Sequence, residues 1–220
     1  MNDDLDWDED EPTFAWVGRT EGYEPIHSAI TGAMWTNDRV PEGWRRAASP
    51  AEAVVGADFI FLIAEGDEAA DLLSRGILTG APAGSCVVLI GPLPDEVRDL
   101  ASRLEAAGLA ALDLALLGNP ARVSVGGERD TFNLLRPHLA PRAFFCGVHG
   151  AGTLAAMGER ALLARTESDR LGGLEALLAN AERSGAYPQA LRNVWKAGPV
   201  SSPAFDAEAD RLTKRQNLTS

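Results

Sequence analysis

The sequence predicts an α/β protein with a doubly wound parallel sheet, followed by a short all-helical C-terminal segment. Runs that are apolar on both faces, such as Phe59–Ile63 and Cys86–Ile90, are typical of buried parallel strands. Helical patterns separate these runs in a regular rhythm, and right-handed crossovers join the strands into one sheet. From Gly150 onward the strand patterns stop and only helical patterns remain.

Composition places the chain among globular proteins and excludes several partners. It has 220 residues, of which 45% are hydrophobic, and a formal net charge of -12. Such a surface repels nucleic-acid phosphates and anionic lipid, so we expect neither nucleic acid nor a membrane as a partner. The sequence has no secretory signal and no apolar run long enough to span a bilayer, which predicts a cytoplasmic protein.

Three segments are expected. Residues 1–12 form an acidic leader that is expected to be disordered, 13–149 the α/β domain, and 150–220 a helical dimerisation segment. An alternative role for the leader is to bind a metal or a partner. Cys86 and Cys146, the only cysteines, lie in apolar runs and are predicted to be buried free thiols, and no cysteine and histidine spacing fits a metal site.

The first elements are those of a dinucleotide-binding βαβ unit. The apolar run Phe14–Val17 ends on Gly18, a short helix is predicted near Pro25–Thr31, and a second strand covers Ala33–Trp35. A strand, a turn that opens on glycine, a helix and a strand begin a Rossmann-like domain.

The rest of the chain continues the pattern. Ser49 is predicted to be the N-cap of a helix, with Pro50 at its first position and Glu52 completing a capping box. Further strands are predicted at Leu109–Leu116, Ala121–Val125 and Ala143–Val148, and further helices at Asp67–Ser74, Pro94–Ala107, Thr131–Leu139, Ala151–Thr166, Asp169–Ser184 and Asp206–Arg215, with Pro188, Pro199 and Pro203 in the joints.

Several short motifs occur in an order that resembles a known family. They are Ala48–Glu52, Gly56–Asp58, Val125–Gly127 with Phe132 and Arg136-Pro137, and Gly150–Gly152. Over about Phe14–Arg160 the chain resembles the 3-hydroxyisobutyrate dehydrogenase type of β-hydroxyacid dehydrogenases, related to 6-phosphogluconate dehydrogenase. The resemblance implies a nucleotide-binding domain, a helical dimerisation domain, and hydride transfer between NAD or NADP and a small 3-hydroxyacid.

The cofactor-binding motif of that family is incomplete in this sequence. Its phosphate turn is G-x-G-x-x-G, and Gly18, Thr20 and Tyr23 stand at the three glycine positions. Side chains at the second and third positions obstruct a dinucleotide, although Gly22 could substitute in a shifted register. By resemblance, Asn37, Asp38 and Arg39 lie at the positions that determine, in that family, whether NAD or NADP binds. Asp38 suits a ribose hydroxyl and Arg39 a 2′-phosphate, and a solvated loop is the alternative.

The substrate-binding and catalytic motifs also differ. The family's two substrate loops fall on Gly91-Pro92 and on Leu117-Gly118-Asn119, which carry no hydroxyl groups. The catalytic lysine position is Ala156, and the family asparagine one turn later is Arg160. Alanine cannot exchange a proton with a substrate hydroxyl. The only lysines, Lys196 and Lys214, match no motif.

Other residues could act at the rim of the cleft. His149 is a candidate general acid or base with Asp113 or Glu159 as its orienting partner, or else a hydrogen-bonded loop histidine. Arg160 could hold an anion, or could instead pair with Glu159 or Glu167 on its own helix.

Three functions remain open. The first, which we favour, is non-redox chemistry or binding of a small polar or anionic ligand in the interdomain cleft. The second is a catalytically silent homodimer that acts by interaction, and the third is an NAD(P)-dependent oxidoreductase of unusual cofactor register. Apolar faces on the C-terminal helices predict a homodimer, through Leu154, Met157, Leu162, Leu171, Leu174 and Leu178.

Overall fold

The computed structural model describes residues 11–118 and 120–217, with side chains described as far as residue 212. Most of the predicted leader, residues 1–10, therefore lies outside the described residues. The described chain forms an 8-stranded sheet in the order β3-β2-β1-β4-β5-β6-β7-β8. The strands are β1 (Phe14–Gly18), β2 (Gly32–Trp35), β3 (Arg45–Arg46), β4 (Phe59–Ile63), β5 (Cys86–Ile90), β6 (Ala110–Leu117), β7 (Arg122–Gly127) and β8 (Arg142–Gly147).

The predicted doubly wound α/β fold is confirmed, with one departure from a parallel sheet. Strands β1 to β6 pair in parallel, whereas β7 pairs antiparallel with β6, in a register that sets Leu117 opposite Arg122. The connection between these two strands is too short for a parallel crossover. Strand β8 is parallel to β7, so both run opposite to the first six strands.

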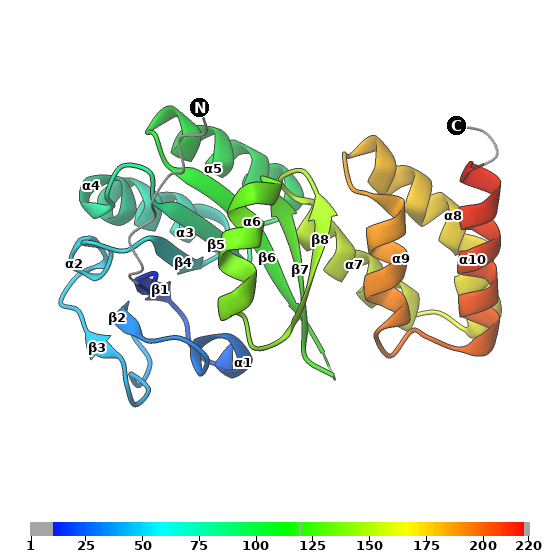
Figure 1. The fold of residues 1–220 in the computed structure, drawn as a ribbon, viewed down its shortest axis with the longest axis horizontal. Coiled ribbons are helices and arrows are strands. Elements are labelled where there is room, and N and C mark those ends of the chain that lie inside the picture. The colour runs from blue at the N-terminus through cyan, green and yellow to red at the C-terminus, as the bar shows by residue number, and fades with distance from the viewer. Residues whose placement is uncertain (1–10, 119, 218–220) are drawn as a thin grey trace, which may run out of the picture.

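Helices flank the sheet on both faces (Figure 1). One face carries α2 (Pro50–Ala53), α3 (Gly66–Leu72), the π-helical turn Leu73–Ile77, α4 (Leu78–Gly80) and α5 (Pro94–Ala106). The other carries α1 (Glu24–His27) and α6 (Arg129–Leu135), which ends in the 3-10 turn Arg136–His138. The capping box at Ser49 is confirmed, since Ser49 Oγ accepts from Glu52 N at 3.1 Å and Glu52 Oε2 accepts from Ala48 N at 3.0 Å.

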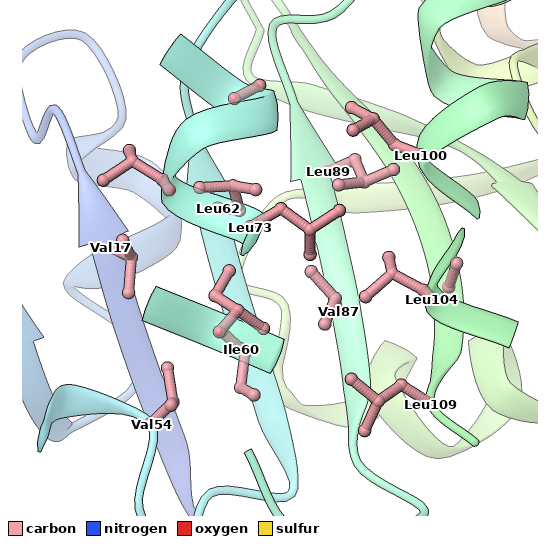
Figure 2. Close-up of a cluster of buried hydrophobic side chains, with 14 of the residues drawn as sticks. Val17, Val54, Ile60, Leu62, Leu73, Val87, Leu89, Leu100, Leu104 and Leu109 are labelled. Atoms are coloured by element: carbon pink, nitrogen blue, oxygen red, sulfur yellow. The ribbon is translucent and has the colours of Figure 1, made fainter. Parts of the chain in front are cut away.

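Alternate residues of each central strand fill two separate cores. On the face of α2 to α5, Val17, Ile60, Leu62, Val87 and Leu89 meet side chains of α5 and of the segment around Leu73 (Figure 2). This alternation is what a strand buried on both faces produces.

The opposite face is filled by aromatic side chains. Trp16 is fully buried and its ring stacks on Phe61 at 5.5 Å, while the edges of Trp44 and His27 meet it at 6.1 and 5.5 Å. Helix α1 has only 4 residues, so large rings occupy the layer that a longer helix would cover.

The chain ends in a helical segment of α7 (Ala151–Leu163), α8 (Glu167–Arg183), α9 (Pro188–Lys196) and α10 (Pro203–Asn217). Helix α7 lies along β6 and β7, helix α9 packs beside it and against β8, and α8 and α10 lie farther from the sheet (Figure 1). Helix α9 was not predicted, because Pro188 was interpreted as part of a joint although proline is favoured in a first helical turn. Among the described helices, none has the length and apolar character that crossing a bilayer requires.

Candidate functional site

The site lies at the carboxyl edge of the first six strands, where β1, β4, β5 and β6 end. Gly18 closes β1 with a φ of 117°, and a Cβ atom there would lie 2.1 Å from the carbonyl oxygen of Ile63. A glycine is therefore required where β1 approaches β4. The close packing of β1 on β4 is therefore enough to explain a glycine at position 18, independent of any ligand.

The turn after Gly18 binds a carboxylate of the protein itself. The backbone N–H of Thr20 donates to Asp38 Oδ2 at 2.8 Å, and the Thr20 hydroxyl donates to the same oxygen at 3.1 Å. Asp38 is held in turn by its own N–H, which donates to Thr36 Oγ1 at 3.0 Å. Arg46 Nη2 donates to the Asp38 carbonyl at 3.1 Å, so the loop after β2 is fixed against the turn after β1.

These hydrogen bonds stabilise Asp38 as an anion. The backbone N–H of Thr20 lowers the pKa of Asp38 against the opposing effect of desolvation, and the Thr20 hydroxyl, Glu21 N–H and Thr36 hydroxyl lower it further. In a dinucleotide site, backbone N–H groups of this turn receive the pyrophosphate. Here a fixed negative charge occupies that position. The residues present do not fit the pyrophosphate of a nicotinamide dinucleotide.

Of the predicted cofactor-binding residues, Gly18, Thr20 and Asp38 meet in this turn, and Tyr23 lies next to it. Asn37 and Arg39 are exposed beside Asp38. The ring centroid of Tyr23 lies 6.4 Å from that of Trp16, so the side chain at the family's third glycine position packs onto the aromatic core. The helix that follows is shorter than the predicted Pro25–Thr31.

A group of charged side chains surrounds Tyr23. Arg19 pairs with Glu65 at 2.9 Å, and both side chains are largely exposed. Burial raises the pKa of Tyr23, and the guanidinium groups of Arg19 and Arg160 act in the opposite direction. Arg160, which extends from α7, therefore lies within electrostatic reach of Tyr23.

Arg160 was predicted to bind an anion or to pair on its own helix, and the pairing is wrong. Glu159 instead forms a buried bidentate pair with Arg122, with distances of 2.9 and 3.0 Å. Glu167 accepts a hydrogen bond from the Ser202 hydroxyl. Arg160 is exposed and makes no ion pair with any side chain that the structure describes.

The Arg122–Glu159 pair was missed at the sequence level and joins three elements. Arg122 Nη1 also donates to the Val194 carbonyl of α9 at 2.6 Å, and Arg122 Nε to the Pro120 carbonyl at 3.2 Å. The sequence did contain one indication of this pair, since Arg122 is a single charged residue within the apolar run Ala121–Val125. The pair positions α7, and with it Arg160, against β7.

The two predicted substrate loops lie at the same edge. Gly91 follows β5 and lies beside Ala64 and Glu65, since a Cβ atom at Gly91 would come within 3.0 Å of Glu65 Cγ. A hollow of about 360 Å³ lies at the end of β6, lined by Pro25, Leu116, Leu117, Gly118 and Ala121. Although Leu117 contributes to this hollow, it is only 4% exposed and packs in the core of the helical segment. Asn119 lies outside the described residues.

Ala156, at the family's catalytic lysine position, is buried on α7 and offers no group that can titrate. Two residues further on, a Cβ atom on Gly158 would lie 2.4 Å from Trp195 Cζ2. Trp195 Nε1 also donates to the Ala155 carbonyl at 2.8 Å. Helix α9 therefore packs closely onto this stretch of α7.

His149 lies at the opposite edge of the sheet from Gly18. It follows β8, whose end lies with the starts of β5 and β6, and it lines a hollow of about 480 Å³ with Gly84, Gly108 and Leu109. Its Nε2 pairs with Glu105 Oε1 at 3.0 Å, and neither predicted partner, Asp113 nor Glu159, holds it. The expectation that it shares a rim with the phosphate turn is therefore wrong.

Asp113 is fully buried and caps helix α7. Its Oδ1 accepts from Gly150 N at 2.7 Å, and its Oδ2 accepts from Thr153 N at 2.8 Å. Burial raises the pKa of Asp113, while the two N–H groups and the nearby His149 lower it. Gly126 and Gly152 are needed around it, because a Cβ atom on either would lie within 3.0 Å of its carboxylate.

No protein-family model matches the chain, and a search of curated proteins finds no match. Solved structures do match it. A 3-hydroxyisobutyrate dehydrogenase from Mycobacterium tuberculosis, solved with L-serine, is 20% identical with a TM-score of 0.59, over 89% of this chain and 73% of that chain. The Salmonella typhimurium 3-hydroxyisobutyrate dehydrogenase is 19% identical with a TM-score of 0.56, over 92% and 79%. A variant imine reductase from Myxococcus stipitatus, solved with NAD+, is 21% identical with a TM-score of 0.58, over 95% and 78%.

These matches and the sheet order define a Rossmann-like α/β protein with a C-terminal helical segment. The chain has the fold of the 3-hydroxyisobutyrate dehydrogenase-like oxidoreductases, and the resemblance seen in the sequence is confirmed at the level of the fold.

Proposed function

We propose that this protein does not transfer hydride by the mechanism of that family and that it binds a small anionic ligand at the carboxyl edge of its sheet. The observation that carries the proposal is the Asp38 carboxylate on the N–H of Thr20, where a pyrophosphate would have to bind. Displacing it would break two hydrogen bonds and bring like charges together. In addition, Ala156 stands where the family has its proton-transferring lysine, so that group is absent.

Arg160 is the residue that we propose to hold the anion. Its guanidinium is exposed and lies within electrostatic reach of Tyr23. It extends from a helix that the buried Arg122–Glu159 pair fixes against the sheet. A guanidinium binds carboxylates and phosphates by two parallel hydrogen bonds. The ligand class is therefore a small carboxylate or phosphate.

Thermal unfolding with inorganic phosphate, malonate and 3-hydroxypropionate, each at about 10 mM, tests this binding because a ligand of the folded state raises the melting temperature. We expect at least one of these anions to stabilise the protein. The Arg160→Gln variant should lose the shift, whereas Arg183→Gln, on the exposed surface of α8, should keep it. Equal shifts in all three proteins, or no shift with any anion, would overturn the proposal.

A separate assay tests the redox part. We expect no oxidation of NADH or NADPH above background in the presence of small 3-oxoacids. A steady rate that scales with protein concentration would overturn the loss of hydride transfer, whatever the anion experiment shows.

We also propose that residues 150–220 form a homodimer interface, with 13–149 as the α/β domain. Leu162, Leu174 and Leu178, predicted to be available, are buried within the chain. On α7, Met157 and Leu163 remain 42% and 40% exposed, and they support the proposal. Sedimentation at micromolar concentration should give the mass of two chains, and a monomeric mass would contradict it.

A further inference from the structure

A groove on the far side of β8 from β7 carries a cluster of positive charge. It has a volume of about 880 Å³ and runs between the start of β8 and the end of α9, which lie side by side (Figure 1). The residues that matter in its wall are Arg136, Arg142, Phe144, Asn193 and Lys196.

The two arginines of this basic groove are not neutralised by described side chains. Arg142 lies over the ring of Phe144 at 4.8 Å, and neither it nor Arg136 forms an ion pair within the described part of the chain. Lys196 pairs with Asp210 at 2.9 Å, with 30% of its side chain exposed. In a protein of net charge -12, such a cluster attracts the most acidic segment within reach.

Strand β8 also has a free edge along the groove. It is the last strand of the sheet, and helix α9 packs against it, but within the described residues its outer edge forms backbone hydrogen bonds only near its end. There Gly147 bridges Ala186, and Tyr187 N donates to the Cys146 carbonyl. An extended segment could therefore lie along the start of β8.

The acidic leader has the composition and the point of attachment to occupy this groove. Residues 1–11 are mostly Asp and Glu and carry Leu5 and Trp7 among them. The leader enters β1 at Phe14, whose ring centroid lies 5.4 Å from that of His138. His138 belongs to the turn that also carries Arg136 in the wall of the groove. Ten extended residues span up to about 33 Å, enough to reach the groove from this point.

We propose that the acidic leader of residues 1–11 docks in the basic groove of its own chain. Its carboxylates neutralise Arg136 and Arg142, and its two large apolar side chains cover the apolar floor around Phe144. The association is electrostatic and therefore weakens with ionic strength.

Carbodiimide cross-linking tests the proposal, because it joins a carboxylate to a lysine amine as an amide with loss of water to the reagent. The chain contains only Lys196 and Lys214, and Lys196 lies in the groove, so peptide mass spectrometry assigns each product without ambiguity. The amide between Lys196 and Asp210, 2.9 Å apart, is an internal control. At low salt we expect leader-to-Lys196 amides in the fraction of monomeric mass on a denaturing gel.

Two charge-reversal variants make the test specific. Arg136→Glu with Arg142→Glu should reduce the leader cross-link at least fivefold and leave the Lys196–Asp210 product unchanged. The control variant Arg75→Glu with Arg183→Glu reverses exposed charges outside the groove. It should leave the yields of the leader cross-link and of the Lys196–Asp210 product unchanged. The proposal is overturned if only the control amide forms, if both double variants give the same yield, or if the leader products occur solely in covalent dimers.

Discussion

Asp38 and Thr20 are joined across the phosphate turn by a hydrogen bond of 2.8 Å from the Thr20 N–H to the Asp38 carboxylate. The two residues come from the ends of neighbouring strands, so the bond ties the loop after β2 to the turn after β1. A group of the protein thereby satisfies a backbone donor that nucleotide-binding relatives of this fold direct at a phosphate. This bond is the basis of the proposed loss of dinucleotide binding.

Removing the Asp38 carboxylate should destabilise the protein. In Asp38→Ala the N–H of Thr20, a residue only 7% exposed, loses its acceptor. We expect a loss of about 1 kcal/mol in the free energy of unfolding, measured by urea denaturation. Asp99→Ala, on the exposed side of α5, is the matched control and should stay within about 0.5 kcal/mol of the wild type. A loss no larger than that of the control would show that the bond contributes little.

The same carboxylate predicts a pH dependence. Because hydrogen bonds lower the pKa of Asp38 in the folded state, its stabilising contribution is fully present above the ordinary Asp pKa of about 3.9. It is lost as the pH falls through the lowered folded-state pKa. The difference in unfolding free energy between wild type and Asp38→Asn should therefore shrink below about pH 4. A difference that grows on acidification would contradict the lowered pKa.

Opening the turn should create affinity for a dinucleotide. Asp38→Ala combined with Thr20→Gly frees the backbone N–H and restores the second glycine of the motif. We expect NADH to bind this variant at least tenfold more tightly than the wild type, a change of about 1.4 kcal/mol, by fluorescence titration. Unchanged weak binding would mean that Tyr23 or the 4-residue α1 also closes the site.

The buried Arg122–Glu159 pair should be sensitive to the loss of one partner. Glu159→Gln or Arg122→Met alone should lower the free energy of unfolding by about 3–5 kcal/mol. Each single change leaves the charge of the other partner buried without its counter-ion. Replacing both, as in Arg122→Met with Glu159→Leu, should recover much of that loss. A double-mutant cycle in urea measures the coupling, and additive losses would contradict it.

Both cysteines should be unreactive in the folded protein. Burial raises the pKa of Cys146 to about 12 and raises that of Cys86 as well, so neither forms a thiolate at neutral pH. Ellman's reagent should label neither thiol until the protein is unfolded, and then both. A Ser102→Cys variant, on the exposed surface of α5, supplies the positive control, and rapid labelling of the wild type would contradict the buried state.

The sequence predicted the strands and long helices because their patterns are local. Phe59–Ile63 and Cys86–Ile90 are strands with the predicted bounds, and the predicted capping box at Ser49 is formed. The antiparallel direction of β7 was missed because it depends on the short connection between β6 and β7. The apolar run of β7 has the same pattern in either direction. Helix α9 was missed because Pro188 is equally compatible with a joint and a first helical turn.

The candidate site was predictable in part. The substitutions are visible in the sequence: Thr20 and Tyr23 indicated an altered cofactor turn, and Ala156 indicated that the family's catalytic lysine is absent. That Asp38 would bind the turn itself, and that Glu159 would be held by Arg122, depends on contacts between residues 18 and 37 positions apart. His149 was misplaced for the same reason, since the reversal at β7 carries the end of β8 to the opposite edge of the sheet.

Thermal unfolding of the wild-type protein with NAD, NADH, NADP and NADPH tests the closed turn most directly. Each dinucleotide is compared, at about 1 mM, with sodium pyrophosphate at the same concentration, so that anion effects cancel. We expect no dinucleotide-specific rise in melting temperature, because the Asp38 carboxylate holds the N–H of Thr20. A rise with any one dinucleotide beyond that given by pyrophosphate would show that the carboxylate leaves the turn, and would contradict the proposal that Asp38 closes it.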